Sequence, residues 1–244
     1  MPDAAALWVS RLGMVPYAEA LDAQRAVARS RIAGDIPEDV LLLMEHPPVV
    51  TLGRSAKGEH LTTPAAQLAA RGVELFEVER GGDVTFHGPG QLVGYPIIDL
   101  KRHRRDLHWY LRQVEEALIR ALAAWSIPAE RNAGYTGVWT RGRKIASIGV
   151  HARDWVTWHG FALNVTTDLS YFDLMVPCGI DGVVMTSIAR ELGGAAPSLD
   201  AVMDEVGRAF GEVFSLTLVH APAELLAAAT ATFSSAHTGA SQQR

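Results

Sequence analysis

The sequence predicts one α+β domain built on a mixed, mostly antiparallel sheet with helices packed outside it. Three observations support this fold class. Short strand-like segments recur along the chain, several longer segments have the periodicity of amphipathic helices, and the strand-like segments after residue 137 follow one another through short turns. Consecutive strands joined in this way favour antiparallel pairing. With 244 residues, of which 48% are hydrophobic, the chain is long enough to bury a sizeable core.

The first part of the chain alternates between strand-like and helical patterns. Residues 7–12 alternate apolar and polar side chains, as a half-buried strand does, and residues 15–32 then have helical spacing. The apolar run 40–44 predicts a buried strand that ends at two prolines. The remaining predicted elements are an extended segment at 49–52, a short helix that Thr63 caps and that ends at Ala70, and strands at 73–79, 84–86 and 92–98.

The clearest helical pattern lies in the second part of the chain, at residues 107–125. Three strands should follow it, and a last amphipathic helix should start after an N-cap at Ser198. The predicted ranges are 137–139, 144–151 and 155–165 for the strands, 171–175 for a short helix and 199–214 for the last helix. We expect one domain over residues 1–220 and a partly disordered extension at 221–244, where Ala, Thr, Ser, Gly and Gln dominate.

Composition argues against several classes of function. A formal charge of -5 argues against binding of nucleic acid through bulk electrostatics. The single cysteine cannot form an intramolecular disulfide, which suits a reducing compartment. The N-terminus does not resemble a secretion signal, and no apolar run reaches the ~18 residues of a membrane span. We therefore expect a cytoplasmic protein that binds neither nucleic acid nor membrane.

The single cysteine, Cys178, is either inert packing or a reactive group. Free cysteines are usually buried as small hydrophobes. Here, however, Pro177 fixes the backbone before the sulfur, and Gly179 and Gly182 permit a tight turn, so the sequence favours a thiol that is presented rather than packed.

A reactive thiol needs a cation nearby, because only about 3% of an unperturbed cysteine is ionised at neutral pH. The candidate partners are three histidines in glycine-rich or strand segments, His87, His151 and His159, and one lysine, Lys144. Lys144 begins an apolar strand after an Arg-Gly-Arg turn, although a lysine at a strand start is usually solvated. The residues alone leave the choice open.

Four segments carry a resemblance to a known family. In chain order they are RGGDVTFHGPGQLVGYPI (80–97), GVWTRGRKIASIGVH (137–151), WVTWHGFALNV (155–165) and VPCGIDGVVMTS (176–187). They resemble the octanoyltransferases of lipoate biosynthesis, which move an octanoyl group from an acyl carrier protein to a lysine of a lipoyl domain. LLLMEHPPVVTLGR (41–54) agrees more weakly. The resemblance implies the fold of biotin- and lipoate-protein ligases.

The resemblance also implies site residues and partners. It implies a catalytic pair, Cys178 and Lys144, and no metal or cofactor. The acyl-binding residues that it implies are Arg80, Gly81, Gly82, Asp83, Val84, Thr85, Phe86, His87, Ser147, Ile148, Gly149, Gly160, Phe161 and Ala162. The implied donor is octanoyl-acyl carrier protein, and the implied acceptors are lipoyl domains of 2-oxoacid dehydrogenase E2 subunits and the glycine cleavage H protein. Phe86 stands where relatives carry Tyr or Trp, a mild change to a pocket wall.

For several residues the sequence leaves both a structural and a functional interpretation open. The glycine pairs of 80–90 are either tight turns or an acyl slot, and His87 and Asn164 either satisfy buried hydrogen bonds or act on the substrate. The basic run Lys101–Arg105 is either a solvated loop or a docking patch for an acidic carrier protein. Rival functions are an ATP-dependent lipoate or biotin ligase, a noncatalytic acyl-binding protein and a cysteine hydrolase.

Overall fold

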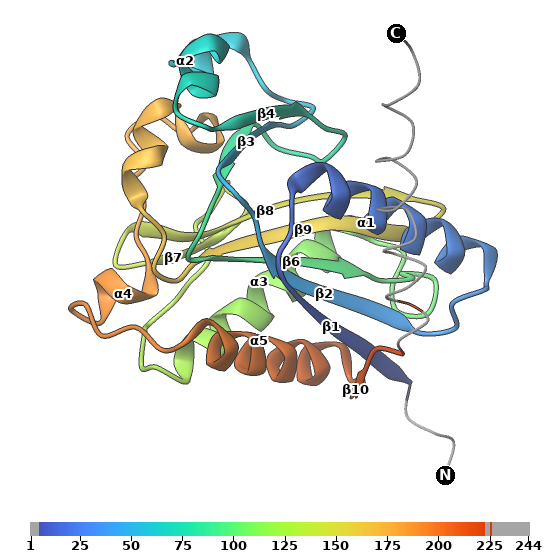
Figure 1. Ribbon diagram of the computed structural model, residues 1–244. Coiled ribbons are helices and arrows are strands. Elements are labelled where there is room, and N and C mark those ends of the chain that lie inside the picture. The colour runs from blue at the N-terminus through green and yellow to red at the C-terminus, as the bar shows by residue number, and fades with distance from the viewer. Residues whose placement is uncertain (1–4, 223–224, 226–244) are drawn as a thin grey trace, which may run out of the picture.

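A computed structural model describes residues 5–222 and residue 225, which fold around a seven-stranded sheet and a smaller three-stranded sheet (Figure 1). The strands of the large sheet are β1 (Ala6–Met14), β2 (Asp39–Glu45), β6 (Gln91–Ile97), β7 (Val138–Thr140), β8 (Arg143–Arg153), β9 (Val156–Asn164) and β10 (Thr217–His220). Those of the small sheet are β3 (Val49–Leu52), β4 (Glu74–Glu77) and β5 (Val84–His87).

The large sheet confirms the predicted mixed, mostly antiparallel arrangement. Its order is β10-β1-β2-β6-β9-β8-β7, and only the pairs β10-β1 and β1-β2 are parallel. Two features were not predicted. The exposed strand β10 pairs along β1, and the small sheet, β4-β3-β5, is separate. Pro47 and Pro48 lie between β2 and β3, where proline interrupts strand hydrogen bonding, so the chain leaves the large sheet there.

Side-chain alternation along the strands divides the core into two layers. In β2, Leu41 and Leu43 face one layer, whereas Val40, Leu42 and Met44 face the other. Helices α3 (Leu107–Ala123) and α5 (Leu199–Phe214) cover the first face, and α1 (Tyr17–Ala33) covers the second (Figure 1). The continuous apolar run at 40–44 is thus a strand buried on both faces, as predicted.

Of the two N-caps predicted from the sequence, the structure confirms one. Ser198 caps α5 by accepting a hydrogen bond from the amide of Ala201, as predicted. The prediction for Thr63 is wrong, because α2 (Ala65–Ala70) begins after Pro64 and has no side-chain cap. The amide of Thr63 instead donates to the carbonyl of Leu174 (3.2 Å), which ties this segment to the chain that precedes Cys178.

The remaining short elements are η1 (Gly58–His60), η2 (Leu169–Leu174), η3 (Pro177–Gly179) and α4 (Ile188–Glu191), and η2 matches the short helix predicted at 171–175. Elements η2 and η3 contact β5 of the small sheet, whereas Ile188 of α4 packs in the core layer that α3 and α5 cover. The predicted extension at 221–244 lies outside the described residues, apart from 221–222 and 225. In the part of the chain that the structure describes, no helix combines the length and apolar character needed to cross a bilayer.

Candidate active site

Cys178 occupies a tight turn that presents its sulfur. Its φ is 58°, and that of Gly179 is 63°, so two consecutive residues adopt the left-handed conformation. The amide of Gly179 donates to the carbonyl of Val176 (2.9 Å), and the amide of Ile180 donates to that of Pro177 (3.1 Å). A left-handed residue other than glycine is strained and often marks a functional site. The half-buried thiol agrees with the predicted presentation rather than with inert packing.

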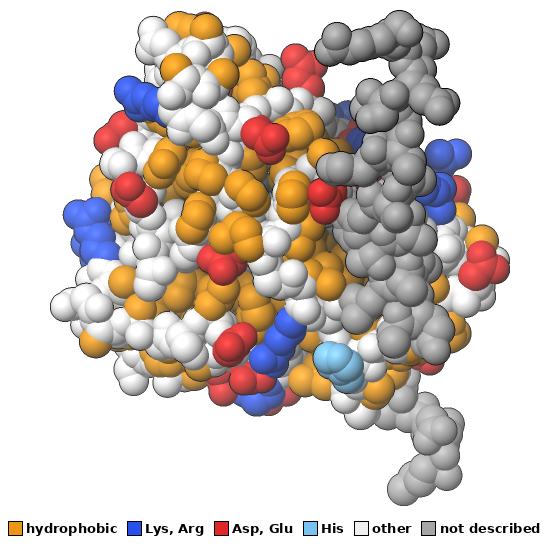
Figure 2. Space-filling view, in the orientation of Figure 1, with side chains coloured by type: hydrophobic (Ala, Val, Ile, Leu, Met, Phe, Trp, Pro, Cys, Tyr) orange, Lys and Arg blue, Asp and Glu red, His pale blue; other side chains and the backbone are white. Residues whose placement is uncertain are grey.

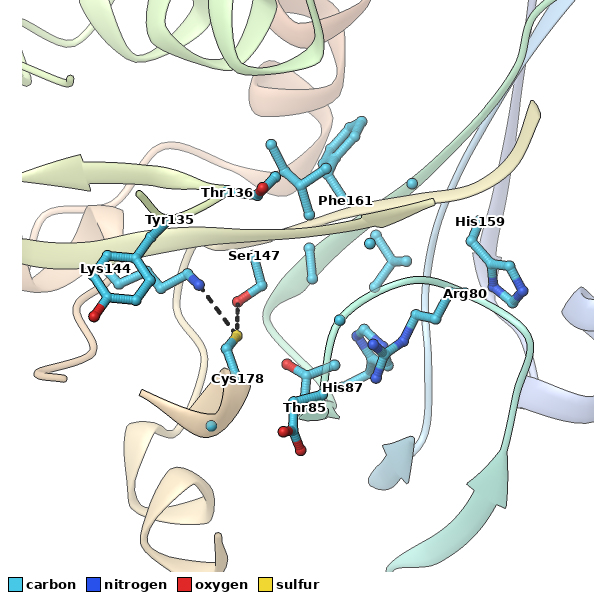
Figure 3. Close-up of a pocket in the computed structure, with 18 of the residues that line it drawn as sticks. Arg80, Thr85, His87, Tyr135, Thr136, Lys144, Ser147, His159, Phe161 and Cys178 are labelled. Carbon is cyan, nitrogen blue, oxygen red and sulfur yellow. Dashed lines mark hydrogen bonds between the residues drawn. The ribbon is translucent and has the colours of Figure 1, made fainter. Parts of the chain in front are cut away.

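Lys144 lies beside this sulfur because the chain that leaves the turn pairs with the start of β8. The amide of Lys144 donates to the carbonyl of Val184 (2.8 Å), and the amide of Thr186 donates to the carbonyl of Lys144 (2.9 Å). The Lys144 ammonium is 3.1 Å from Sγ of Cys178, and Ser147 Oγ is 3.6 Å from the same sulfur (Figure 3). Backbone pairing therefore fixes the distance between the two side chains.

The Lys144 ammonium is buried beside the sulfur. Lys144 is 1% exposed, and its Nζ lies 4.9 Å from the centre of the Trp139 ring. Within residues 5–222 and 225, Lys144 forms no ion pair with a carboxylate. A buried ammonium is costly unless a negative charge compensates it. A thiolate at Cys178 would supply that charge, and the ammonium would in turn stabilise the thiolate.

The three candidate histidines do not contact Cys178. His151 hydrogen-bonds the carbonyl of Glu79 (3.2 Å), and His159 Nε2 lies 3.7 Å from the Glu79 carboxylate. His87 Nδ1 lies 2.9 Å from Oε1 of Gln91. Burial lowers the pKa of His87 to about 3, so this ring is neutral at pH 7 and supplies no cation. The structure thus places Lys144, and none of these histidines, beside the sulfur.

A cavity of about 240 Å³ opens beside Cys178, between the α1 face of the large sheet and the small sheet. Its floor carries small side chains, since Ser147 pairs with Ala162 and Gly149 pairs with Gly160 across β8 and β9. Such a floor leaves room for a chain of atoms to lie on the sheet. The lining is more apolar than polar, as expected for a site that holds a hydrocarbon.

Most of the predicted site residues line this cavity. Together with Cys178 and Lys144 they are Arg80, Gly82, Asp83, Thr85, His87, Ser147, Ile148, Gly149, Gly160, Phe161 and Ala162. In Figure 3, Ser147 of β8 and Thr85 of β5 lie on the side of the large sheet that carries Cys178, whereas the Phe161 ring lies on the opposite side.

Three predicted residues lie elsewhere. The amide of Gly81 donates to the carbonyl of Val150 (2.8 Å), which joins its backbone to β8. Val84 and Phe86 alternate with Thr85 and His87 along β5, so they point away from the cavity. Phe86 stacks on Tyr171 at 4.4 Å, and its identity therefore affects an apolar cluster rather than a pocket wall, which corrects that expectation.

Sequence reasoning missed other lining residues, among them Tyr17, Val93, Tyr95, Tyr135 and Ile180. Tyr17 lies on the apolar face of a predicted helix, so its position in the sequence predicted only a core residue. Burial raises the pKa of Tyr17 to about 12. Tyr135, in contrast, is 45% exposed, and its ring centre lies 6.4 Å from that of Trp139.

Arg80 and Asn164 connect the segments around the cavity through hydrogen bonds. The guanidinium of Arg80 donates to the carbonyl of Thr51 (2.7 Å) and to its hydroxyl (2.8 Å), which fastens the glycine-rich loop to β3. Asn164 accepts from Gln91 (2.9 Å) and donates to the carbonyl of Thr186 (3.0 Å). These contacts favour the structural interpretation of Asn164.

The basic run Lys101–Arg105 is largely balanced by carboxylates. Lys101 lies 3.6 Å from Asp99, Arg102 lies 3.7 Å from Glu38 and Arg104 lies 3.2 Å from Asp106. His103 adds a contact of 2.7 Å with Asp39. These contacts favour a solvated, ion-paired loop.

A shallow groove with several apolar lining residues borders the Cys178 turn. Its lining includes Phe172, Met175, Pro177 and Val184, and Val184 is 50% exposed. Figure 2 shows apolar side chains gathered on the viewed face between α2 and α5, with acidic side chains among them. Within the described ranges, no three His, Cys, Asp or Glu side chains converge as a metal site would need.

Comparison with known proteins identifies the family to which this chain belongs. The family model described as the lipoyl protein ligase A/B catalytic domain matches residues 16–211. The chain is 53% identical over 212 residues to an octanoyltransferase of Rubrobacter xylanophilus, covering 86% of this chain and 94% of the relative. It is 49% identical over 220 residues to an octanoyltransferase of Myxococcus xanthus, but spans only 61% of that relative against 88% of this chain.

Among solved structures, lipoate-protein ligase A bound with ATP has a similar fold. The TM-score is 0.74 at 17% identity, over 95% of this chain and 94% of that one. This confirms the predicted likeness to lipoate-protein ligases in fold alone. The family model and the relatives' identity together show that this chain belongs to the lipoyl protein ligase A/B family, as an acyltransferase of the octanoyltransferase group.

Proposed function

We propose that this enzyme takes an octanoyl group from octanoyl-acyl carrier protein, holds it as a thioester on Cys178 and passes it to a lysine of a lipoyl domain. The observation that carries the proposal is the 3.1 Å contact between the Lys144 ammonium and Sγ of Cys178 at the mouth of a partly apolar cavity. Acceptors of this chemistry include the lipoyl domains of 2-oxoacid dehydrogenase E2 subunits and the glycine cleavage H protein.

In the first step the Cys178 thiolate attacks the carbonyl carbon of the donor thioester. The bond between that carbon and the carrier's sulfur breaks as the carbon–Sγ bond forms. The leaving carrier thiolate takes a proton from the Lys144 ammonium, which lies within hydrogen-bond distance of the reacting sulfur. One thioester replaces another, so this step is nearly balanced in free energy and needs no ATP.

In the second step Lys144 is neutral, because the acylated sulfur no longer carries the charge that held its proton. It takes one proton from the acceptor's ammonium, and the resulting amine attacks the acyl-Cys178 carbonyl. The amide nitrogen then loses its second proton to solvent, and Cys178 leaves as a thiolate beside the restored ammonium. Formation of an amide from a thioester makes this step favourable.

The cavity supports an acyl chain rather than a polar substrate. Val93 and Ala162 line it with apolar side chains, and the glycine pair of β8 and β9 leaves its floor open. Each buried methylene contributes about 0.8 kcal/mol, so chain length should be measurable in affinity. Arg80, Gly82, Asp83, Thr85, His87, Ser147, Gly149 and Gly160 would complete the acyl site.

The proposal is tested by intact-mass measurement without ATP. The protein is mixed with octanoyl-acyl carrier protein, and an unmodified lipoyl domain is then added. The expected result is a gain of one octanoyl group on the enzyme, absent in Cys178→Ala, followed by its transfer to the lipoyl domain.

Other outcomes would favour the rival functions. A requirement for ATP would indicate a ligase, and release of free octanoate as the main product would indicate a hydrolase. Tight octanoyl binding with no covalent gain would indicate an acyl-binding protein. Each of these results would contradict the proposal.

A further inference from the structure

His60 and Asp83 form a hydrogen-bonded pair against the turn that carries Cys178. Nδ1 of His60 lies 2.7 Å from Oδ2 of Asp83, and the two side chains are 17% and 9% exposed. Asp83 begins the chain segment that enters β5 and lines the cavity, whereas His60 ends η1. The proton transfers described above use neither residue.

The pair occupies the space in which a side chain at position 179 would lie. A Cβ on Gly179 would be 2.6 Å from Oδ2 of Asp83 and 2.9 Å from Nδ1 of His60. Both side chains are therefore packed directly on the backbone of the residue that follows the nucleophile. Cys178 itself is left-handed, a conformation that is strained for a residue with a side chain and persists only where its surroundings enforce it.

Hydrogen bonds of these two residues connect the pair to the Cys178 turn, to the start of β5 and to the loop after β3. The carbonyl of His60 accepts from the amide of Val176 (2.8 Å), at the start of the Cys178 turn. Oδ1 of Asp83 accepts from the amide of Val84 (2.7 Å), and the carbonyl of Asp83 accepts from Gly53 (3.3 Å). The turn is thus supported by the loop after β3 and by the start of β5, independently of the pairing between Lys144 and residues 184–186.

From this packing we infer that the His60–Asp83 pair positions the nucleophile: it braces Gly179 and so holds Sγ of Cys178 in the direction from which an acyl carbonyl is attacked. The inference rests on the proposed function, since it concerns acylation of Cys178. Both residues act through the turn, so they are positioning residues.

The test compares two reactions of Cys178 in each variant. Acylation by octanoyl-acyl carrier protein needs a fixed direction of attack, whereas alkylation by iodoacetamide, a small reagent, does not. For Asp83→Ala and His60→Ala we expect acylation to slow about tenfold or more and alkylation to change about threefold or less. The double variant should be no slower than either single variant, because the two side chains act as one unit.

Two further substitutions separate shape from charge. In Asp83→Asn the amide oxygen still accepts from Val84 and the amide nitrogen donates to the other tautomer of His60, so acylation should slow less than in Asp83→Ala. Asp83→Glu keeps the charge but adds a methylene against Gly179, and it should slow acylation. Asp181→Ala is the matched control, because it removes an exposed carboxylate from the same segment.

Melting temperatures of all variants identify any loss that reflects unfolding, and Asp83→Asn and Asp83→Glu keep the comparison available if an alanine variant does not fold. Equal loss of acylation and alkylation would overturn the inference, as would wild-type acylation in both Asp83→Ala and Asp83→Glu. A wild-type protein that is alkylated but never acylated would overturn the proposed function itself, and the inference with it.

Discussion

The ammonium of Lys144 and the sulfur of Cys178 lie 3.1 Å apart, although 34 positions separate them in the chain. They meet because residues 184–186, just after the cysteine turn, pair with the first residues of β8.

Removing either member of the pair should abolish most transfer. Cys178→Ser replaces the thiolate with a poor nucleophile, and Lys144→Ala removes the group that stabilises it and moves the protons. Each should lower the rate of octanoyl transfer by a factor of about 10² to 10⁴, measured as acylated lipoyl domain over time. Lys101→Ala, a lysine of the ion-paired loop, is the control. Near-normal transfer in Cys178→Ser or Lys144→Ala would contradict the proposed mechanism.

Filling the cavity should shorten the preferred acyl chain. Ala162→Val adds two carbons to the floor beside Ser147 and so takes up part of the cavity of about 240 Å³. Each methylene that no longer fits forfeits about 0.8 kcal/mol, or about fourfold in affinity. We expect the ratio of octanoyl to hexanoyl acylation of Cys178 to fall. Ala152→Val, on β8 outside the cavity lining, should leave the ratio unchanged, and an equal ratio in Ala162→Val would argue against this acyl site.

Acid should destabilise the fold before carboxylates titrate. Burial lowers the pKa of His46 to about 4 and that of His87 to about 3, whereas an unfolded histidine has a pKa of about 6.5. Because the folded values are depressed, this stability is fully present above about pH 6.5 and is lost as pH falls toward them. Between pH 7 and pH 5 each histidine should remove about 2 kcal/mol from the free energy of unfolding.

Urea unfolding at pH 7 and pH 5 measures that difference. His46→Gln should reduce it, since glutamine does not titrate, and His108→Gln, at an exposed site on α3, should not. The same free energy of unfolding at both pH values would show that the two rings are not held neutral by burial.

Charge reversal in the basic loop should have little effect on transfer. Lys101, Arg102 and Arg104 each have a carboxylate within 4 Å, so the loop presents little net charge to a partner. For Arg104→Glu with Arg105→Glu we expect the KM for octanoyl-acyl carrier protein to change about twofold or less. A much higher KM for the carrier-borne donor, with no change for a small octanoyl thioester, would instead establish docking at this loop.

Local chemistry made part of the site predictable. Pro177 and Gly179 flank the cysteine with residues that favour a turn, and the structure has that turn in a left-handed conformation. Neighbouring residues could not show whether Lys144 or a histidine lies beside Cys178, because that depends on which strand residues 184–186 pair with. The sequence likewise could not show which face of β5 lines the cavity. Alternation puts Thr85 and Phe86 on opposite faces, but only the contact between the two sheets decides which of them lines the cavity.

The amino-acid sequence by itself determined the α+β class, the buried strand at 40–44, the three long helices and a presented cysteine, since periodicity and turn chemistry are local properties. Tertiary structure alone decided the separate small sheet, the pairing of β10 with β1, the cavity between the sheets and the packing of His60 and Asp83 on Gly179. Those features join residues far apart in the chain, and such contacts are selected by the packing of the whole fold rather than by neighbouring residues.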